Sequence, residues 1–138
     1  MIVKFKGIKP TRATDGSAGY DLVCNEEFGI GLFPGLNIVV DTGTFIEIPK
    51  GYVGKVCPRS GLAAKKGITV LNAPGIIDSD YRGEIKVILV NHGLLHAHIE
   101  RGDRIAQLLI QKVEYVEFID GDLSETDRGE GGLGSTGA

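Results

Sequence analysis

The sequence is poor in cysteine, in basic charge and in long apolar runs. Its 138 residues include 2 cysteines, and 15 lysines and arginines face 18 acidic residues, which gives a formal net charge of −3. A general nucleic-acid-binding protein usually carries a basic excess, so we expect no nucleic-acid partner. No apolar run approaches the roughly 20 residues that a membrane helix needs, so we expect no membrane partner.

Cysteine usage and the first residues both bear on the compartment. Cys24 and Cys57 form no CxxC pair, and each lies in an apolar, strand-like segment. This pattern predicts reduced and buried thiols. Residues 1–6 alternate like a strand and lack the apolar core of a signal peptide, so we expect a cytoplasmic protein.

Glycine, by contrast, is abundant. The chain has 21 glycines, roughly twice the usual share of about 7%. Glycines spread among short apolar runs indicate many tight turns, which favours an all-β sandwich or barrel over βαβ units. The expected strands are residues 2–5, 20–23, 36–40, 45–48, 52–56, 68–71, 85–90, 97–99 and 105–118. One helix is expected over residues 60–66, with Ser60 as its N-cap and Gly67 as its terminator.

The C-terminal segment differs from the rest. We expect one β domain over residues 1–120 and a tail over residues 121–138, where apolar residues nearly vanish and glycines cluster in RGEGGLGSTGA. Such a segment cannot pack a core, so we expect it to be mobile. It is either a disordered end or a loop whose backbone N–H groups bind phosphate oxygens. It lacks the lysine of a Walker loop, so a P-loop nucleotidase is not supported.

The stretch LNAPGIIDSDYRGEIKVILV, residues 71–90, is the strongest candidate site. We interpret it as two apolar arms, residues 75–77 and 84–90, joined by a polar hairpin turn. Turn residues alone describe a solvated hairpin. Two details favour a site: Asp78 directly follows aliphatic residues, so its carboxylate starts from a partly dry place, and the Tyr81 ring is near enough to cover a ligand.

Three other segments carry candidate chemistry. In residues 58–61 a helix N-terminus with Arg59 and Ser60 would bind phosphate oxygens. An ordinary capped helix with a surface arginine would show the same sequence pattern. Gln107 shares a strand face with Ile105 by alternation and needs a hydrogen-bond partner, as a structural glutamine also does. Asp103 and Arg104 look like a surface or interface pair.

Histidine suggests a metal site only weakly. His96 and His98 share a predicted strand face and His92 lies nearby, but no third ligand follows at a suitable spacing. We interpret all three as exposed loop histidines.

Five blocks together resemble the trimeric dUTPase family, in the family's order and over nearly the whole chain. They are AGYDL at 18–22, PRSGL at 58–62, GIIDSDYRG at 75–83, GDRIAQL at 102–108 and RGEGGLGSTG at 128–137. The resemblance implies a distorted jelly roll of the β-clip, dUTPase-like type, with one short helix and a flexible glycine-rich tail. It also implies a homotrimer whose active sites lie at subunit interfaces, each closed by a neighbour's tail.

The resemblance implies an enzyme, a dUTP diphosphatase that hydrolyses dUTP to dUMP and pyrophosphate. This reaction would limit uracil incorporation into DNA and supply dUMP for thymidylate synthesis. Mg²⁺ would be the cofactor, bound through the triphosphate and not by protein ligands. By position, Asp78 would orient and deprotonate the attacking water, and Tyr81 would pack on the deoxyribose and reject ribonucleotides.

The same resemblance assigns the remaining site residues. Uracil and its sugar would be bound by Asn72, Ile76, Ile77 and Lys86, and the phosphates by Arg59, Ser60, Gly61 and Gln107, while Asp21 would organise the site. The tail would contribute Arg128, Leu133, Gly134, Ser135 and Thr136. The family usually has an aromatic residue at the position of Leu133, so about 0.5–1.5 kcal/mol of tail affinity is expected to be missing.

Two alternatives remain open at this point. A dCTP deaminase of the same fold would need a carboxylate beside the exocyclic amine of the base, which the 71–90 stretch does not clearly show. A non-catalytic jelly-roll binding protein would use Asp78 and Tyr81 only as turn residues. The glycine-rich fifth block favours the diphosphatase.

Overall fold

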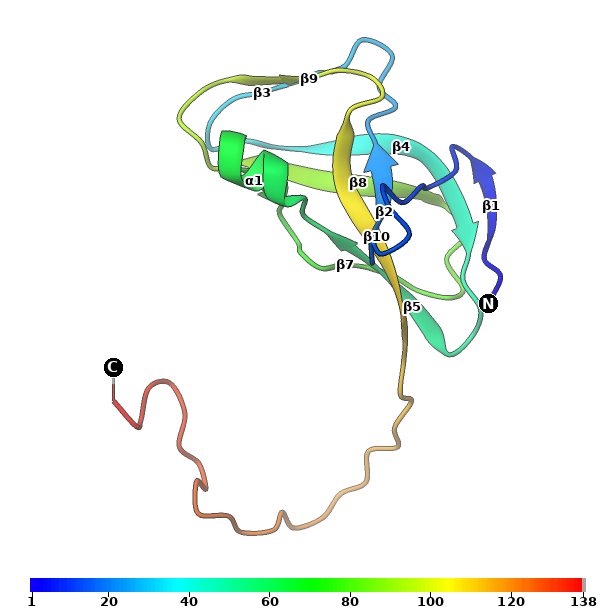
Figure 1. The fold of residues 1–138 in the computed structure, drawn as a ribbon. Coiled ribbons are helices and arrows are strands. Elements are labelled where there is room, and N and C mark those ends of the chain that lie inside the picture. The colour runs from blue at the N-terminus through cyan, green and yellow to red at the C-terminus, as the bar shows by residue number, and fades with distance from the viewer. Residues whose placement is uncertain (138) are drawn as a thin grey trace.

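The computed structural model describes residues 1–137, which form ten strands and one short helix (Figure 1). The elements in chain order are β1 Lys4–Gly7, β2 Tyr20–Val23, β3 Ile30–Leu32, β4 Asn37–Glu47, β5 Tyr52–Cys57, α1 Ser60–Lys66, β6 Ile68–Val70, β7 Gly75–Ile77, β8 Glu84–Asn91, β9 Ala97–Ile99 and β10 Arg104–Lys112. None of the helices formed by these residues is long and apolar enough to cross a membrane.

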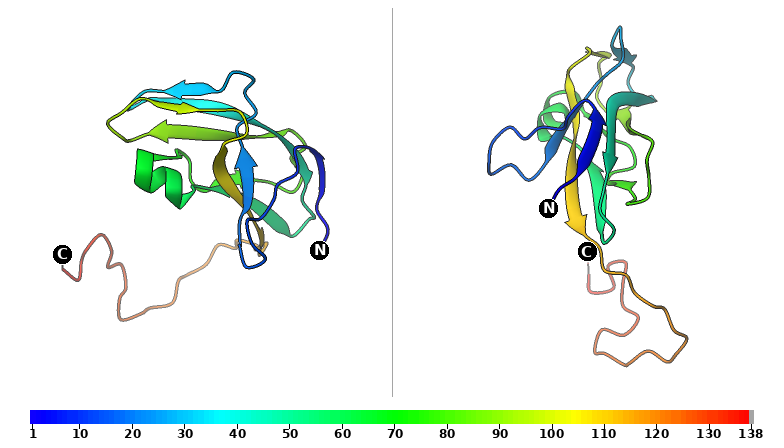
Figure 2. Two further views of the ribbon diagram at one scale, coloured as in Figure 1. Left: turned by 45° about the horizontal axis from the view of Figure 1, so that its top comes forward. Right: turned by 90° about the vertical axis from the view of Figure 1, so that its right-hand side faces the viewer.

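The strands form two four-stranded sheets and one strand pair. One sheet has the order β1-β4-β8-β6, the other has the order β2-β10-β5-β7, and β3 pairs with β9. All named pairs are antiparallel. Strand β10 crosses the direction of β4 and β8, so the two sheets pack face to face at a large angle (Figures 1 and 2). The predicted all-β jelly-roll class with one short helix is confirmed.

The core lies between the sheets and is built by strand alternation. Along β8, Ile85, Val87 and Leu89 are each 0% exposed. The intervening side chains of Glu84 and Lys86 lie on the opposite face. Burying each aliphatic side chain stabilises the fold by about 1.5–3 kcal/mol. Core packing thus fixes β8 and, with it, the polar side chains on its other face.

Several predicted strands are confirmed, and the differences have local causes. The predicted runs 36–40 and 45–48 both belong to β4, which is bulged between them. Strand β3 was missed because it has three residues centred on a glycine. The predicted run 105–118 ends as a strand at Lys112, because residues 113–118 pair with no strand in the described part of the chain.

The predicted hairpin between β7 and β8 is wrong. Strand β7 pairs with β5, whereas β8 pairs with β4 and β6, so residues 78–83 connect two different sheets. Each arm of the predicted hairpin therefore pairs with strands other than the opposite arm. The turn itself is present, since the Tyr81 N–H donates to the Asp78 carbonyl oxygen at 3.1 Å.

The helix occupies its predicted range, but its N-cap does not. Arg59 is the N-cap residue, and it makes no capping bond through its side chain. Ser60 is already the first helical residue. It therefore lacks the extended backbone conformation that lets an N-cap side chain accept a bond from the first turn. Gly67 ends the helix as predicted, with φ 68° and its N–H donating to the Ala63 carbonyl oxygen at 3.0 Å.

The two cysteines differ in burial. Both are free thiols, and Cys24 is buried whereas Cys57 is half-buried. The prediction of buried thiols is therefore confirmed for Cys24 and wrong for Cys57, which is the last residue of β5 and less covered. Burial raises the pKa of the Cys24 thiol.

Residues 113–137 contain no helix or strand. This segment leaves the body at the end of β10 and follows a wide arc outside it (Figure 1). The segment forms local turns, and in one of them the Gly131 N–H donates to the Arg128 carbonyl oxygen at 3.1 Å. The last strand ends at Lys112; the domain boundary at residue 120 and the mobility of the tail stay predictions.

Candidate functional site

Six of the predicted substrate residues line a single cleft of about 230 Å³ between β7 and β8. They are Asn72, Ile76, Ile77, Asp78, Tyr81 and Lys86. Ligand pockets for drug-sized molecules usually measure about 300–1,000 Å³. The cleft, which we call the β7–β8 cleft, therefore suits one small ring system, with aliphatic walls and a few polar groups at the rim.

Strand β7 gives this cleft a backbone edge. It is the outermost strand of its sheet and pairs with β5 on one side. In the described part of the chain no strand lies on its other side, so one row of its N–H and C=O groups is available to a ligand. A planar ring with alternating donors and acceptors can bind such an edge as a neighbouring strand would.

Asp78 lies at the mouth of the cleft, directly after β7. It also lines a wider groove of about 1420 Å³ that continues past the cleft. Its side chain is exposed in the single chain, so the predicted dry surroundings are absent. The reason is that Ile76 beside it is itself 54% exposed, as a residue on a short edge strand. The carboxylate is free to reach a water molecule or a ligand in the cleft.

Tyr81 is held across the turn by its hydroxyl. The O–H donates to the Glu84 carbonyl oxygen at 2.8 Å, while the ring stays 42% exposed and lines the cleft. A Cβ atom at Gly83 would lie 2.4 Å from the Tyr81 hydroxyl oxygen. Glycine at this position therefore leaves the ring its place.

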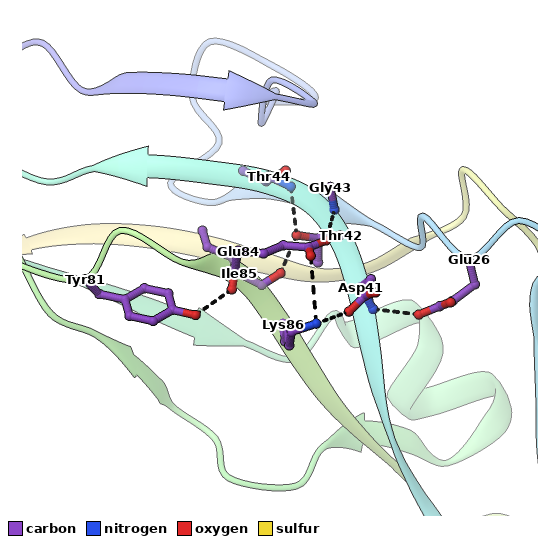
Figure 3. A network of polar contacts seen from close by, with 9 residues as sticks. All are labelled: Glu26, Asp41, Thr42, Gly43, Thr44, Tyr81, Glu84, Ile85 and Lys86. Carbon is purple, nitrogen blue, oxygen red and sulfur yellow. Dashed lines mark hydrogen bonds and ion pairs between the residues drawn. The ribbon is translucent and has the colours of Figure 1, made fainter.

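Lys86 comes from the polar face of β8. Its ammonium donates to the Asp41 carboxylate and lies 3.8 Å from Glu84 Oε2 (Figure 3). The hydrogen bond to Asp41 raises the pKa of Lys86 and so favours its charged form. The sequence indicated Lys86 but not Asp41, which lies 45 residues away along the chain. Glu84 belongs to the same strand as Lys86, and its spacing of two residues was the available signal.

A second cleft of about 350 Å³ carries the positive charge. Arg59 and Gly61 line it as predicted, and Ser60 begins α1 beside them. We call it the basic cleft, because three more cationic residues line it that the sequence did not indicate, namely Lys65, Lys66 and Arg104. The helical spacing from Gly61 to Lys65 was the available signal for the lysines. Such a cluster with an exposed helix start can bind phosphate oxygens.

Asp21 connects the arginines of the basic cleft. Its carboxylate lies 3.3 Å from Arg59 Nε and 3.6 Å from Arg104 Nη1, with its side chain 14% exposed. Arg104 therefore pairs with Asp21 and not with Asp103, which accepts the Glu100 N–H at 2.9 Å, so the predicted Asp103–Arg104 pair is wrong.

Gln107 has the hydrogen-bond partner that its half-buried position requires. Its side-chain amide donates to the Pro58 carbonyl oxygen at 2.9 Å. A bulge between Arg104 and Ala106 breaks the alternation of β10, so both Ile105 and Ala106 are buried. The predicted common face for Ile105 and Gln107 is therefore wrong. The bond to Pro58 joins β10 to the segment that precedes α1.

One chain does not bring all predicted site residues together. The β7–β8 cleft and the basic cleft share no lining residue. The tail residues line neither cleft: Arg128, Leu133, Gly134, Ser135 and Thr136. Arg128 instead donates from Nε to the Gly131 carbonyl oxygen at 2.8 Å. The predicted residues thus form three separate parts of the molecule.

The histidines are exposed, but His98 lies in β9 and not in a loop. The His96 ring packs against Phe33 with centroids 4.3 Å apart. Within residues 1–137, no group of three or more His, Cys, Asp or Glu side chains is arranged to hold a metal ion.

Comparisons with known proteins agree on one family. The dUTPase family model matches residues 6–137. The deoxyuridine 5'-triphosphate nucleotidohydrolase of Nocardia farcinica is 52% identical over 130 residues, which is 93% of this chain and 78% of that protein. A mutant dUTPase of Staphylococcus bacteriophage 80alpha, solved with dUpNHpp, has a TM-score of 0.82 and 26% identity over 99% of both chains. A mutant dUTPase of phage phi11 of S. aureus, described with a structural Mg(II) ion, has a TM-score of 0.79 and 22% identity over 91% of this chain and 100% of that one.

Proposed function

The chain belongs to the dUTPase family and is a dUTP diphosphatase, and we propose that its β7–β8 cleft binds the deoxyuridine of dUTP. The reaction hydrolyses dUTP to dUMP and pyrophosphate, which limits uracil incorporation into DNA and supplies dUMP for thymidylate synthesis. The observation that carries the assignment is that six predicted substrate residues, including Asp78, line this one small cleft.

Uracil would be bound by the free edge of β7. The backbone N–H and C=O groups on that edge, which come from alternate residues of the strand, would meet the acceptors and the donor of uracil. Ile76, Ile77 and Asn72 line the cleft around that position. Cytosine presents a reversed donor pattern and would leave buried groups unpaired, which is a strong basis for rejection. The narrow aliphatic cleft would exclude the methyl group of thymine by contact.

The sugar would pack on the Tyr81 ring. Its hydroxyl is already engaged by the Glu84 carbonyl oxygen, so the ring is held in place before substrate binds. A ribose 2′-hydroxyl would collide with the held ring, whereas deoxyribose would not. Lys86 would complete the polar rim of the cleft beside the sugar.

Asp78 would act as the general base. The oxygen of a water molecule attacks the innermost phosphorus, and Asp78 takes a proton from that water. The bond from this phosphorus to the bridging oxygen breaks, so dUMP forms and pyrophosphate leaves with the electron pair. Phosphoryl transfer of this kind depends on an aligned water and on charge neutralisation.

Mg²⁺ would enter as its complex with the triphosphate. Magnesium usually keeps several waters and is held through substrate phosphates with few protein ligands. When bound, it neutralises phosphate charge and orients the chain of phosphates. Asp21 fits a different role, because its carboxylate is already engaged by Arg59 and Arg104 at 3.3 and 3.6 Å.

The phosphates would bind at the basic cleft of another copy of the chain. The donors would come from Arg59, Ser60, Gly61 and Gln107. These residues lie apart from the β7–β8 cleft of their own chain, so they would serve the cleft of another copy. A homotrimer would join the two clefts at each interface. Arg128 and the residues after it, Leu133, Gly134, Ser135 and Thr136, would then close over a site from a tail that leaves its own body.

Mixing two inactive variants tests this shared site. Asp78→Asn damages one cleft and Arg59→Ala the other, so neither homotrimer should be active. After joint refolding, random assembly should restore about one site in four. If mixed trimers form but the mixture is as inactive as each variant alone, the two clefts of one chain would have to act on the same nucleotide, and the shared site would be contradicted.

A product assay tests the reaction and separates the alternatives. Pyrophosphate and ammonia are measured with every deoxy- and ribonucleoside triphosphate in the presence of Mg²⁺. We expect pyrophosphate from dUTP alone. Ammonia from dCTP would support a deaminase, and nucleotide binding without any product would support a binding protein.

The thiols bear on the compartment. Both Cys24 and Cys57 are free, and free thiols are usual in reducing compartments. We propose on this basis that the enzyme works in the cytoplasm.

A further inference from the structure

The bulge in β4 lies beside the residues that form the rim of the β7–β8 cleft. Asp41 pairs with Lys86 and Phe45 with Glu84, so three residues of β4 face Ile85 alone on β8. The bulged backbone is held by specific bonds. The Thr42 hydroxyl donates to the Ile85 carbonyl oxygen at 2.5 Å, and Thr42 is 0% exposed (Figure 3). A bulge in this place re-aims neighbouring side chains.

Glu84 connects the bulge to the cleft through three contacts. Its Oε1 accepts the Gly43 N–H at 2.7 Å, and its Oε2 lies 3.8 Å from Lys86 Nζ. Its carbonyl oxygen accepts the Tyr81 hydroxyl at 2.8 Å. One residue thus contacts both the ring and the ammonium that line the cleft, and its own side chain is 20% exposed.

Asp41 holds Lys86 from the other strand. Its carboxylate accepts from the Lys86 ammonium, and its backbone N–H donates to Glu26 Oε1 at 2.9 Å. The Asn25 N–H donates to the Asp41 carbonyl oxygen at 2.8 Å. The backbone of Asp41 is therefore held on two sides, which places its carboxylate beside the long and otherwise flexible Lys86 side chain (Figure 3).

We propose that Asp41 and Glu84 are positioning residues that hold the Lys86 ammonium at the rim of the β7–β8 cleft for nucleotide binding. This inference rests on the proposed function of that cleft. An ammonium has three donors. The hydrogen bond to Asp41 and the ion pair with Glu84 hold the ammonium from the protein side and leave it donors for a substrate oxygen. A held lysine also loses less freedom on binding.

The effect of the Asp41 charge on nucleotide binding should depend on whether Lys86 is present. With Lys86 present, the carboxylates are neutralised in part and orient the cation. Without it, two carboxylates would face the polyanionic nucleotide directly, and like charges repel. Removing Asp41 should therefore harm binding when Lys86 is present and help binding when Lys86 is absent. A pair that merely stabilised the β4–β8 ladder would not produce this inversion.

The test measures KM and kcat for dUTP, and Kd for dUMP by calorimetry, in four proteins: wild type, Asp41→Asn, Lys86→Met and the double variant. We expect Asp41→Asn to raise KM and Kd about 3- to 10-fold with kcat within about twofold. Lys86→Met should raise them further, and adding Asp41→Asn to it should lower them again.

Two further variants act as controls. Glu84→Gln keeps an oxygen for the Gly43 N–H but loses the charge, so it should behave like a weaker Asp41→Asn. Glu27→Gln removes an acidic charge from an exposed residue and should change neither KM nor Kd. Equal effects of Asp41→Asn with and without Lys86, in variants that stay folded at the assay temperature, would overturn the proposal. Absence of dUTP turnover in the wild type would instead overturn the proposed function, and the dUMP affinities would still report on the positioning residues.

Discussion

Asp21 lies 3.3 Å from Arg59 Nε, which joins strand β2 to the residue that caps α1. The pair is largely shielded from solvent, with side-chain exposures of 14% for Asp21 and 26% for Arg59. Arg104 contacts the same carboxylate at 3.6 Å. The Asp21 carboxylate therefore sets the direction in which the guanidinium of Arg59 can meet a phosphate.

Replacing Asp21 tests this relationship. Asp21→Asn keeps the shape and loses the charge, so Arg59 is no longer held. A hydrogen bond to a charged group contributes about 1.5–3 kcal/mol, so we expect kcat/KM for dUTP to fall about 10- to 100-fold. Asp15→Asn is the matched control, because it makes the same change at an exposed carboxylate that lines neither cleft. An Asp21→Asn enzyme within twofold of wild type would contradict the role.

Asp78→Asn tests the general base. The amide cannot take a proton from water, and we expect kcat to fall at least about 100-fold while nucleotide binding is largely kept. Affinity for dUMP, measured by calorimetry, is the control for an intact cleft. Near-normal turnover in this variant would remove Asp78 from the chemistry.

Tyr81 is expected to govern sugar selection by its ring and not by its hydroxyl. Tyr81→Phe keeps the ring and loses the bond to the Glu84 carbonyl oxygen, so dUTP should remain preferred over UTP. Tyr81→Ala opens the space for a 2′-hydroxyl and should lower the ratio of kcat/KM values for dUTP and UTP by tenfold or so, as expected when one steric contact is lost. A ratio unchanged in Tyr81→Ala would place the selection elsewhere.

Leu133 tests the tail. The side chain is fully exposed in the single chain and is therefore free to take the proposed place over a nucleotide. Leu133→Phe restores an aromatic face, worth about 0.5–1.5 kcal/mol, so KM for dUTP should fall about 2- to 10-fold. Leu123→Phe, at another exposed tail leucine, should leave KM unchanged. Unchanged or weaker binding in Leu133→Phe would count against a lid role.

The Asp41–Lys86 pair predicts a pH dependence of stability. Its hydrogen bond raises the pKa of Lys86 above the ordinary value. The pair therefore stabilises the folded chain fully below the unfolded-state pKa of about 10.4 and loses that contribution as pH rises through the higher folded-state pKa. Asp41→Asn should lower the free energy of unfolding at pH 8, and the difference from wild type should shrink once the pH is raised beyond the ordinary lysine pKa. Urea unfolding at both pH values measures it, and a difference independent of pH would contradict the assignment.

Sequence reasoning found what is local and missed what depends on register. Residues 75–81 could be assigned to one site because they are contiguous, and α1 with Gly67 followed from local signals. The pairing of β7 with β5 could not be read, since neither arm of the predicted hairpin shows which strand takes its hydrogen bonds. Non-local pairing is set by the whole fold.

The same limit applies to the polar partners of the site. Asp41 reaches Lys86 because a bulge shifts the β4 register, and Arg104 reaches Asp21 because β10 is bulged beside it. A period of two predicts faces only while the alternation is unbroken. Where an extra residue enters, as at Ile105, the faces exchange and the sequence pattern misassigns them.

The outermost position of β7 also has a cost for the protein in the absence of nucleotide. Unpaired strand edges recruit other strands and begin aggregation. This edge is three residues long and starts with glycine, so it is too short for a strand of another molecule to pair with it stably. If β7 binds the base as proposed, the same short strand combines a free edge for the substrate with a low tendency to aggregate.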